Sequence, residues 1–207
     1  MSVLSRIAFY QERRDEVPNQ ELAHELASTK NTEGIMEIAE HLWDKNTDIR
    51  SDCLKVVYEI GYIDPELIAP YVEDFLKLLI SKQNRLVWGA MIALTTIASQ
   101  NAPKLFEKRT KIIKAMDQGS VITIDNGIKV LAAVAAFNVE FQKELFPYLR
   151  EHLRKCRTKE VPQHAESILV CVNETNKEEF LSVLRQRLPD MIPSQAVRIR
   201  KILKQFA

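Results

Sequence analysis

The sequence contains little of what marks several large classes of protein. It has only 5 glycines and 8 prolines among 207 residues, so a chain dominated by turns or disorder is not expected. No run of about 18 apolar residues occurs, which argues against a transmembrane helix. The first residues carry the charges of Arg6, Glu12 and Arg13 and lack the apolar stretch of a signal peptide. We therefore expect no membrane association and a cytoplasmic location.

Cysteine is also scarce. The three cysteines are Cys53, Cys156 and Cys171, and no two of them form a CxxC pair. An odd and scattered set is typical of reduced thiols in the cytosol rather than of a disulfide framework. The simplest interpretation is that these side chains serve as small buried hydrophobic groups.

Patterns that carry chemistry are missing as well. The histidines His24, His41, His152 and His164 show neither HExxH nor HxH spacing, and no glycine-rich phosphate loop is present. Cys156 follows His152 by four residues on one predicted helix, but two ligands alone rarely hold a metal. We therefore predict no metal site, no cofactor and no enzymatic activity.

What the sequence does contain is a repeat of 37 residues. Residues 49–61 align without gaps on residues 86–98, and two further steps of 37 reach residues 127–135 and 164–172. Such a period predicts a solenoid, in which each unit buries its apolar face against its neighbours. The recurring apolar positions are, unit by unit, Leu54, Val57 and Ile60; Met91, Leu94 and Ile97; Ile128, Leu131 and Val134; and Ala165, Ile168 and Cys171.

Helical spacing of apolar residues runs through the whole chain, and no strand alternation appears. Asn19 is expected to cap the second helix, and the junction of Asp64 with Pro65 is expected to start a long one. We predict a single domain over residues 1–207, with capping helices in 1–31 and repeats in 32–207. The expected helices cover about 2–15, 20–29, 33–43, 47–61, 65–81, 84–99, 103–117, 120–137, 140–156, 161–174, 177–188 and 193–206.

Residues 48–61 resemble the second helix of a HEAT repeat, with an aspartate, an Ile-Arg pair, a small residue and spaced aliphatic residues. Pro70 and Pro147 are each followed by tyrosine, and HEAT proteins have a proline that kinks the first helix. The resemblance covers about residues 33–174. It implies an all-α, right-handed α-solenoid of about five helical hairpins. It also implies a binding scaffold whose second helices line a concave face.

The repeat offset aligns polar residues at the starts of the second helices. Asp52, Gly89, Asn126 and Gln163 form one row, and Ser51, Trp88, Asp125 and Pro162 form the row beside it. Such rows of hydrogen-bonding groups suit an extended polar ligand. Helix capping and bonds between repeats are the alternative, above all for Asp48 and Arg50. The predicted partner-binding residues are Arg50, Asp52, Arg85, Trp88, Asp125, Asn126, Gln163 and His164.

His164 stands in a row whose other members, Cys53, Ala90 and Gly127, are small. A ring would crowd a tight junction between helices, so we expect His164 to point into the groove near Gln163 and Asn126. A buried histidine that bonds to a neighbouring repeat is the alternative.

Charge is divided unevenly along the chain. Residues 1–103 contain 10 Lys and Arg against 16 Asp and Glu, whereas residues 104–207 contain 19 against 12. An acidic and a basic half suit orientation of a polar or anionic partner, although an uneven solvated surface explains them too. The densest basic group comprises Arg150, Arg154, Lys155, Arg157 and Lys159, joined by Arg198, Arg200, Lys201 and Lys204.

We predict a non-enzymatic scaffold that binds a protein or peptide in its concave groove, and leave its oligomeric state open. The alternative is a nucleic-acid-binding protein, or a DNA glycosylase of the HEAT-fold alkylpurine type. That class uses Trp, Asp and Arg in a concave cleft, for which Trp43, Asp44, Trp88 and Asp125 are the candidates here. Two tryptophans and a pI near 7.7 give this alternative little support.

Overall fold

The computed structural model describes residues 2–206, and within these residues it contains helices and no strand. The all-α helical-repeat fold predicted from the 37-residue period is confirmed. The α-helices are α1 (Val17–Ser28), α2 (Thr32–Glu40), α3 (Thr47–Ile63), α4 (Val72–Leu78), α5 (Asn84–Thr96), α6 (Ala102–Glu107), α7 (Arg109–Gln118), α8 (Val121–Ala135), α9 (Val139–Lys155), α10 (Val161–Ile168), α11 (Lys177–Arg187) and α12 (Pro193–Gln205). Short 3-10 helices are η1 (Leu4–Arg6), η2 (His41–Trp43), η3 (Pro65–Leu67), η4 (Ala69–Tyr71), η5 (Thr158–Glu160), η6 (Leu169–Cys171) and η7 (Leu188–Asp190).

The chain groups into two compact units, Met1–Asn126 and Gly127–Ala207, and the boundary falls inside α8. The prediction of a single domain over residues 1–207 therefore stays a prediction. None of the helices formed by residues 2–206 is long and apolar enough to cross a membrane.

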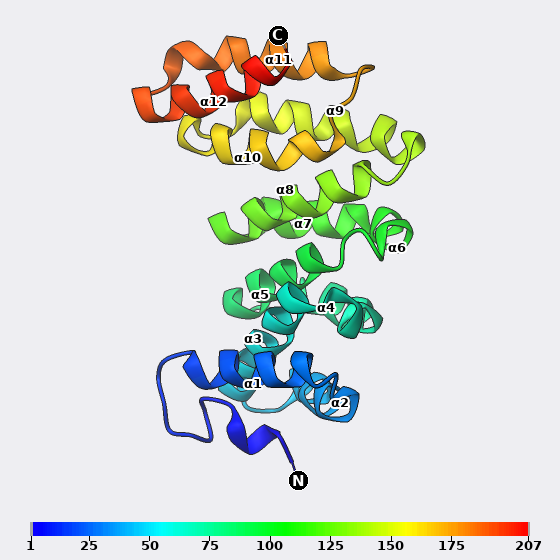
Figure 1. Cartoon of the computed structure of the whole chain (residues 1–207), viewed down its shortest axis with the longest axis vertical. Helices are drawn as coiled ribbons and strands as arrows, with labels where there is room; N and C mark the ends of the chain where they lie inside the picture. Colours follow the sequence, from blue (N-terminus) through cyan, green and yellow to red (C-terminus); the bar gives the residue numbers. More distant parts are fainter. Residues whose placement is uncertain (1, 207) are drawn as a thin grey trace. The chain divides into compact units, whose positions relative to one another are not determined.

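In the N-terminal unit, α1, α3 and α5 stack as one layer of helices (Figure 1). The helices α2 and α4 pack against α3 and α5 and complete two helical hairpins. The helix α1 takes the place of the second helix of a terminal repeat whose first helix is reduced to η1. Such an atypical end unit is expected of a repeat array, because its outer face is exposed to water.

In the C-terminal unit, α9 packs on α11 and α10 packs on α12 (Figure 1). The helices α9 and α10 form one hairpin, and α11 and α12 form the next. A two-pronged ion pair joins the second helices, because Arg198 donates to Glu166 at 2.9 and 2.6 Å. Each layer of this unit therefore again brings equivalent helices of successive repeats together.

The core follows the 37-residue register. All twelve recurring apolar positions predicted from the sequence are at most 2 % exposed. Burying a leucine, isoleucine or valine side chain contributes about 1.5–3 kcal/mol each to folding. The period therefore identifies the residues that hold the repeats together.

The first helix expected from the sequence, over residues 2–15, is wrong. Only η1 is helical there, and Glu12 has a positive φ of 53°. The reason is that backbone N–H groups of this segment bond to side chains elsewhere: Ala8 donates to Asn19 Oδ1 at 2.8 Å and Phe9 donates to Asp52 Oδ2 at 2.7 Å. Asn19 is accordingly not a cap; it lies inside α1 and is fully buried.

The helix expected over residues 65–81 is divided in the structure. Asp64 caps its start as predicted, since its carboxylate accepts the N–H of Glu66 at 3.2 Å. The chain then forms η3, η4 and α4 in succession because Pro70 has no N–H to continue a helical ladder. Pro147, in contrast, lies inside the continuous helix α9.

Candidate functional site

Four of the polar residues at the starts of α3 and α5 are accessible to solvent and form what we call the α3–α5 surface. Asp48 and Arg85 are exposed, whereas Asp52 and Trp88 are half-buried. The helices that carry them pack directly on each other. Asp48, Asp52 and Arg85 line one pocket of the N-terminal unit, and Arg85 and Trp88 line the cleft next to it.

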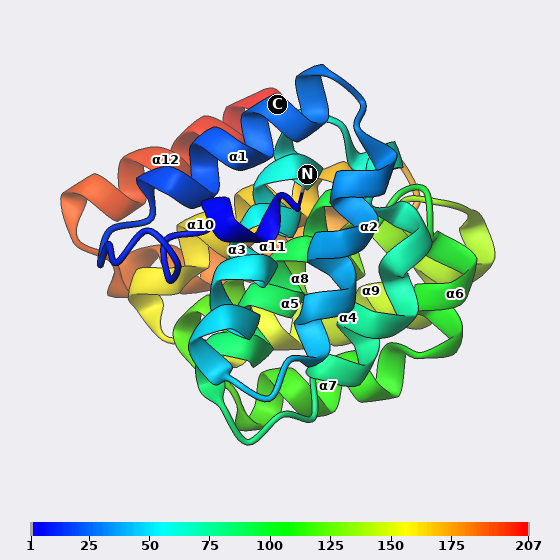
Figure 2. The ribbon, with the colours of Figure 1, turned by 90° about the horizontal axis from the view of Figure 1, so that it is seen from below.

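The N-terminal segment, residues 8–16, lies on this surface. The carboxylate of Asp52 accepts the backbone N–H of Phe9, 43 residues away in sequence, at 2.7 Å. Glu16 at the other end of the segment contacts Arg85 Nη2 at 3.2 Å and Lys55 Nζ at 2.9 Å. Figure 2 shows the segment as a dark-blue loop beside the start of α1. The surface thus already holds a stretch of irregular chain.

A pocket of about 310 Å³ remains between the segment and the two helices. Charged groups dominate its lining, among them Arg14 on the segment and Asp48 and Asp52 on α3. A narrower cleft next to it is lined by Trp88, Lys55 and Glu16. Carboxylates, guanidinium groups and an indole therefore meet here within one small region.

Lys55 is a buried lysine that binds the N-terminal segment through Glu16. Its ammonium group contacts Glu16 at 2.9 Å and Glu59 at 2.6 Å, and lies 4.9 Å from the centre of the Tyr58 ring. Burial by itself lowers the pKa of Lys55, but the hydrogen bonds to Glu59 and Glu16 outweigh it, so the net effect is a raised pKa. Lys55 therefore stays charged and holds the carboxylate of Glu16 in place.

Two of the predicted partner-binding residues bond to backbone of the fold. Arg50 donates from Nε to the carbonyl of Leu42 at 3.0 Å, and its guanidinium lies 6.0 Å from the Trp43 ring. Asn126 is only 7 % exposed, and its amide donates to the carbonyl of Ile122 on the same helix at 2.9 Å. The contact of Arg50 matches the alternative of bonds between helical elements.

Asp125 and Gln163 are half-buried on α8 and α10. Asp125 belongs to the N-terminal unit and Gln163 to the C-terminal unit. The two predicted polar rows, which pair Asp52 with Gln163 and Trp88 with Asp125, stay a prediction.

The expectation that His164 points into the groove is wrong. Its side chain has no exposed surface, and its Nδ1 lies 3.0 Å from Nε2 of His152, with the two ring centres 4.8 Å apart. The position in the repeat register decides burial here, as it does for Cys53 and Ala90. The ring is tolerated because His152 supplies a hydrogen-bonding partner for a buried polar group.

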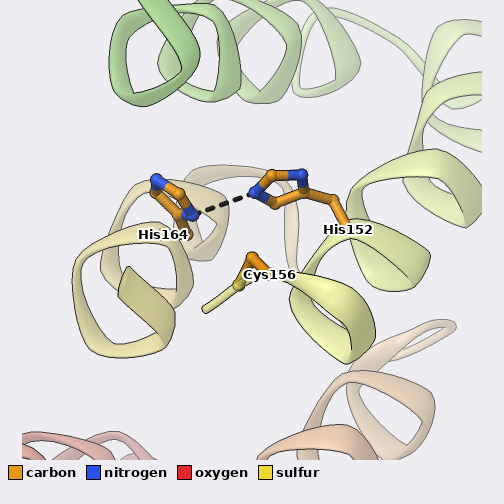
Figure 3. A group of neighbouring side chains, drawn as sticks. All are labelled: His152, Cys156 and His164. Carbon is orange, nitrogen blue, oxygen red and sulfur yellow. Dashed lines mark hydrogen bonds between the residues drawn. The ribbon is translucent and has the colours of Figure 1, made fainter. Parts of the chain in front are cut away.

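Sequence reasoning missed a cluster that contains His164. One ligand atom each from His152, Cys156 and His164 lies within 4.8 Å of the others (Figure 3). The spacing of four residues in the sequence indicated the pair of His152 and Cys156, but the third member, His164, lies on α10. The signal that points to it is a histidine in an otherwise small and buried row.

Part of the basic group near the C-terminus is paired with acidic neighbours. Arg150 pairs with Glu179, Arg154 and Lys155 pair with Glu151, Arg157 pairs with Glu160, and Arg198 pairs with Glu166. The other members, Lys159, Arg200, Lys201 and Lys204, are exposed. The ion pairs therefore offset part of the positive charge of this group.

Comparison with known proteins gives no relative by sequence, since no family model and no curated protein matches the chain. Solved structures do match. A designed armadillo repeat protein in complex with peptide (KR)4 has a TM-score of 0.69 at 18% identity, covering 91% of this chain and 87% of that one. Computationally designed armadillo repeat proteins for modular peptide recognition give 0.65 at 18% identity, over 92% and 94%. An engineered protein gives 0.68 at 16% identity, over 99% and 96%.

At this level of identity the likeness is one of fold, and it agrees with the stacked hairpins and the buried register described above. The chain has the helical-repeat fold of the armadillo- and HEAT-like proteins.

Proposed function

We propose that this chain is a non-enzymatic scaffold that binds an extended segment of a partner protein on the α3–α5 surface. The observation that carries the proposal is the way in which this surface holds residues 8–16. Asp52 accepts a backbone N–H and Arg85 contacts a carboxylate, on a stretch of chain that forms no helix. An extended peptide with an acidic side chain offers the same two groups.

The two contacts recognise different groups of a partner segment, a backbone N–H and an acidic side chain. A carboxylate that accepts a main-chain N–H gives affinity for any residue except proline. The guanidinium of Arg85 favours a partner with an acidic side chain farther along the segment. Trp88 lines a cleft with Arg85 and offers the large, rigid apolar area that dominates many protein interfaces.

The likeness to designed armadillo proteins supports the same class of ligand. Two of these proteins are described by their peptide complex or by modular peptide recognition. Their repeat fold thus suits extended chains. We extend to this chain only the class of partner, a peptide or protein segment, and leave the peptide sequence to experiment.

Because the N-terminal segment uses Asp52 and Arg85, a partner has to compete with it. Glu16→Gln removes the charge that binds Arg85 and Lys55 and so loosens the segment. An exposed ion pair contributes about 0.2–1 kcal/mol, so this substitution should tighten partner binding about 1.4- to 5-fold. Tighter binding after loss of a native contact distinguishes competition from simple damage to the surface.

The experiment selects peptides from a random displayed library on the full chain and measures their affinity by fluorescence anisotropy. Arg85→Ala and Trp88→Ala should each weaken binding about tenfold, the lower end of what a charged hydrogen bond or a buried aromatic contributes. Lys82→Ala and Trp43→Ala are the matched controls, because both side chains are exposed and lie off the α3–α5 surface. They should leave the affinity unchanged.

The proposal fails if the library yields no binder, or if all four alanine variants bind alike. A duplex DNA that shifts in a gel with steep salt dependence would favour nucleic-acid binding instead. Release of bases from alkylated DNA would favour the glycosylase alternative.

A further inference from the structure

The cluster of His152, Cys156 and His164 joins two helices of the C-terminal unit. His152 lies in the last turn of α9 and Cys156 follows directly at its C-terminal end, while His164 comes from α10. The two imidazoles meet at 3.0 Å between Nε2 of His152 and Nδ1 of His164. Figure 3 shows the two rings facing each other with the Cys156 side chain close below them.

The spacing of these atoms is close to that of a metal centre. In a tetrahedral zinc site, with Zn–N of about 2.0–2.1 Å and Zn–S of about 2.3 Å, ligand atoms lie about 3.3–3.6 Å apart. The two nitrogens are already at 3.0 Å, and the Cys156 sulfur lies within 4.8 Å of both. Rotation of the Cys156 side chain about its own bonds covers the remaining distance, because Cys156 ends the helix rather than packing inside it.

The kind of ligand atom selects the ion. Two imidazole nitrogens and one thiolate sulfur form a borderline-soft set that suits zinc and does not suit the oxygen-preferring Mg²⁺ or Ca²⁺. We propose that His152, Cys156 and His164 bind one Zn²⁺ ion, which links α9 to α10 and leaves a fourth position for water. The ion connects the two helices of one repeat across their turn.

The surroundings are compatible with a dication. His164 is fully buried, whereas His152 and Cys156 are half-buried, so the ion enters from the side of α9. The carboxylate of Glu160 acts electrostatically on both Cys156 and His164. Arg187 lies close to Cys156 and favours its thiolate form. The burial that raises the pKa of the Cys156 thiol to about 11 is what a bound cation would offset.

Zinc binding requires one proton to leave the site and another to change its position within it. The Cys156 thiol loses its proton to water as the sulfur–zinc bond forms. The proton now shared between the two imidazoles moves to the other nitrogen of the ring that carries it, so that both facing nitrogens present lone pairs. No oxidation or reduction takes place, and one proton is released for each ion bound.

The first test uses cobalt as a spectroscopic substitute for zinc, added to the full-length chain after treatment with a chelator. Stoichiometric Co²⁺ should produce the visible bands of tetrahedral cobalt and the near-ultraviolet band of a thiolate–cobalt bond, and zinc should abolish both. Cys156→Ser should remove the thiolate band, and His152→Gln should weaken binding at least tenfold. Cys171→Ser and His24→Gln are matched controls, a thiol of the same unit and an exposed histidine, and should change neither.

The second test measures folding, and it separates ligation from a merely structural role of the cluster. Zinc at about a hundredfold excess over its Kd should raise the Tm of the wild-type chain by about 5–10 °C. The Cys156→Ser chain, folded by circular dichroism, should show no such rise. Zinc should also protect Cys156 from alkylation, read by mass spectrometry. Absence of the thiolate band in the wild-type chain, or its persistence in Cys156→Ser, would overturn the proposal.

Discussion

Arg187 gives the sharpest test of how the C-terminal unit is held together. It ends α11, and its guanidinium reaches the C-terminal end of α9, where it donates to the carbonyls of Leu153, Arg154 and Cys156 at 2.8, 2.7 and 2.9 Å. The last carbonyls of a helix have no N–H partner within the helix. One side chain therefore caps a helix of the neighbouring hairpin.

The magnitude follows from these three contacts. A hydrogen bond from a charged donor contributes about 1.5–3 kcal/mol when buried, and about 1 kcal/mol is reasonable for the half-buried Arg187. The positive charge at a helix C-terminus adds about 0.3–1 kcal/mol. With about 1 kcal/mol for each of the three hydrogen bonds, Arg187→Met should therefore lower the free energy of unfolding by about 3–4 kcal/mol. Arg187→Lys keeps the charge but lacks the planar fork, so about half of the loss should remain.

The assay is urea unfolding of the full chain followed by circular dichroism. Arg185→Met is the matched control, since Arg185 lies on the same helix, is exposed and has only a distant contact with Glu178 at 3.9 Å. It should change the free energy by less than about 0.5 kcal/mol. The reasoning is refuted if Arg187→Met behaves like Arg185→Met. Full rescue by Arg187→Lys would show that charge alone matters and that the three hydrogen bonds do not.

Three further outcomes can be measured with the same assay. Gly61→Ala should lower the free energy of unfolding by about 1–3 kcal/mol, because a Cβ there would overlap the Thr96 hydroxyl; an unchanged midpoint would contradict the close packing of α3 on α5. Leu54→Ala should lower it by about 2–5 kcal/mol, since Leu54 is 1 % exposed in the repeat core; a smaller loss would mean that the site collapses freely. The Arg198 guanidinium holds the pKa of Glu166 below its usual range, so the stability from this pair is present above about pH 4.3 and is lost as the pH falls below it. Glu166→Gln should therefore reduce the loss of unfolding free energy between about pH 6 and about pH 3.5, by less than about 1 kcal/mol because the pair is exposed. A loss as large as in the wild-type chain would contradict this.

The fold was largely predictable because one simple rule governs it. A period of 37 residues repeats the same burial at each step, from Leu54 to Met91 and on to Ile128 and Ala165. Apolar periodicity reports on packing against a neighbour of the same kind, and here the neighbour is the next repeat. Helix ends were predicted closely where the repeat register holds, as for α3 and α5, but not where the chain forms 3-10 turns, as between Pro65 and Tyr71.

The places where prediction failed involve side chains that satisfy backbone groups far away. Nothing in the pattern of residues 2–15 reveals that Asp52 and Asn19 take up the N–H groups of Phe9 and Ala8. Likewise the small residues in the row of His164 predicted that its ring would point outward. His152 on the preceding helix α9 supplies a partner that allows the ring inside. Both depend on a partner that only the tertiary structure brings near.

The N-terminal segment also determines which substitutions this chain tolerates. Glu37, Asn19 and Asp52 accept the backbone N–H groups of Val3, Ala8 and Phe9 at 2.9, 2.8 and 2.7 Å. Every amino acid except proline supplies that donor, so exposed positions such as Phe9 are free to diverge without loss of order. Much of what orders this end of the molecule therefore lies outside it, in three acceptors on α1, α2 and α3, together with the burial of Ile7 and Ala8. A chain with different exposed residues in this stretch can keep the same cap as long as those three acceptors and the two buried residues remain.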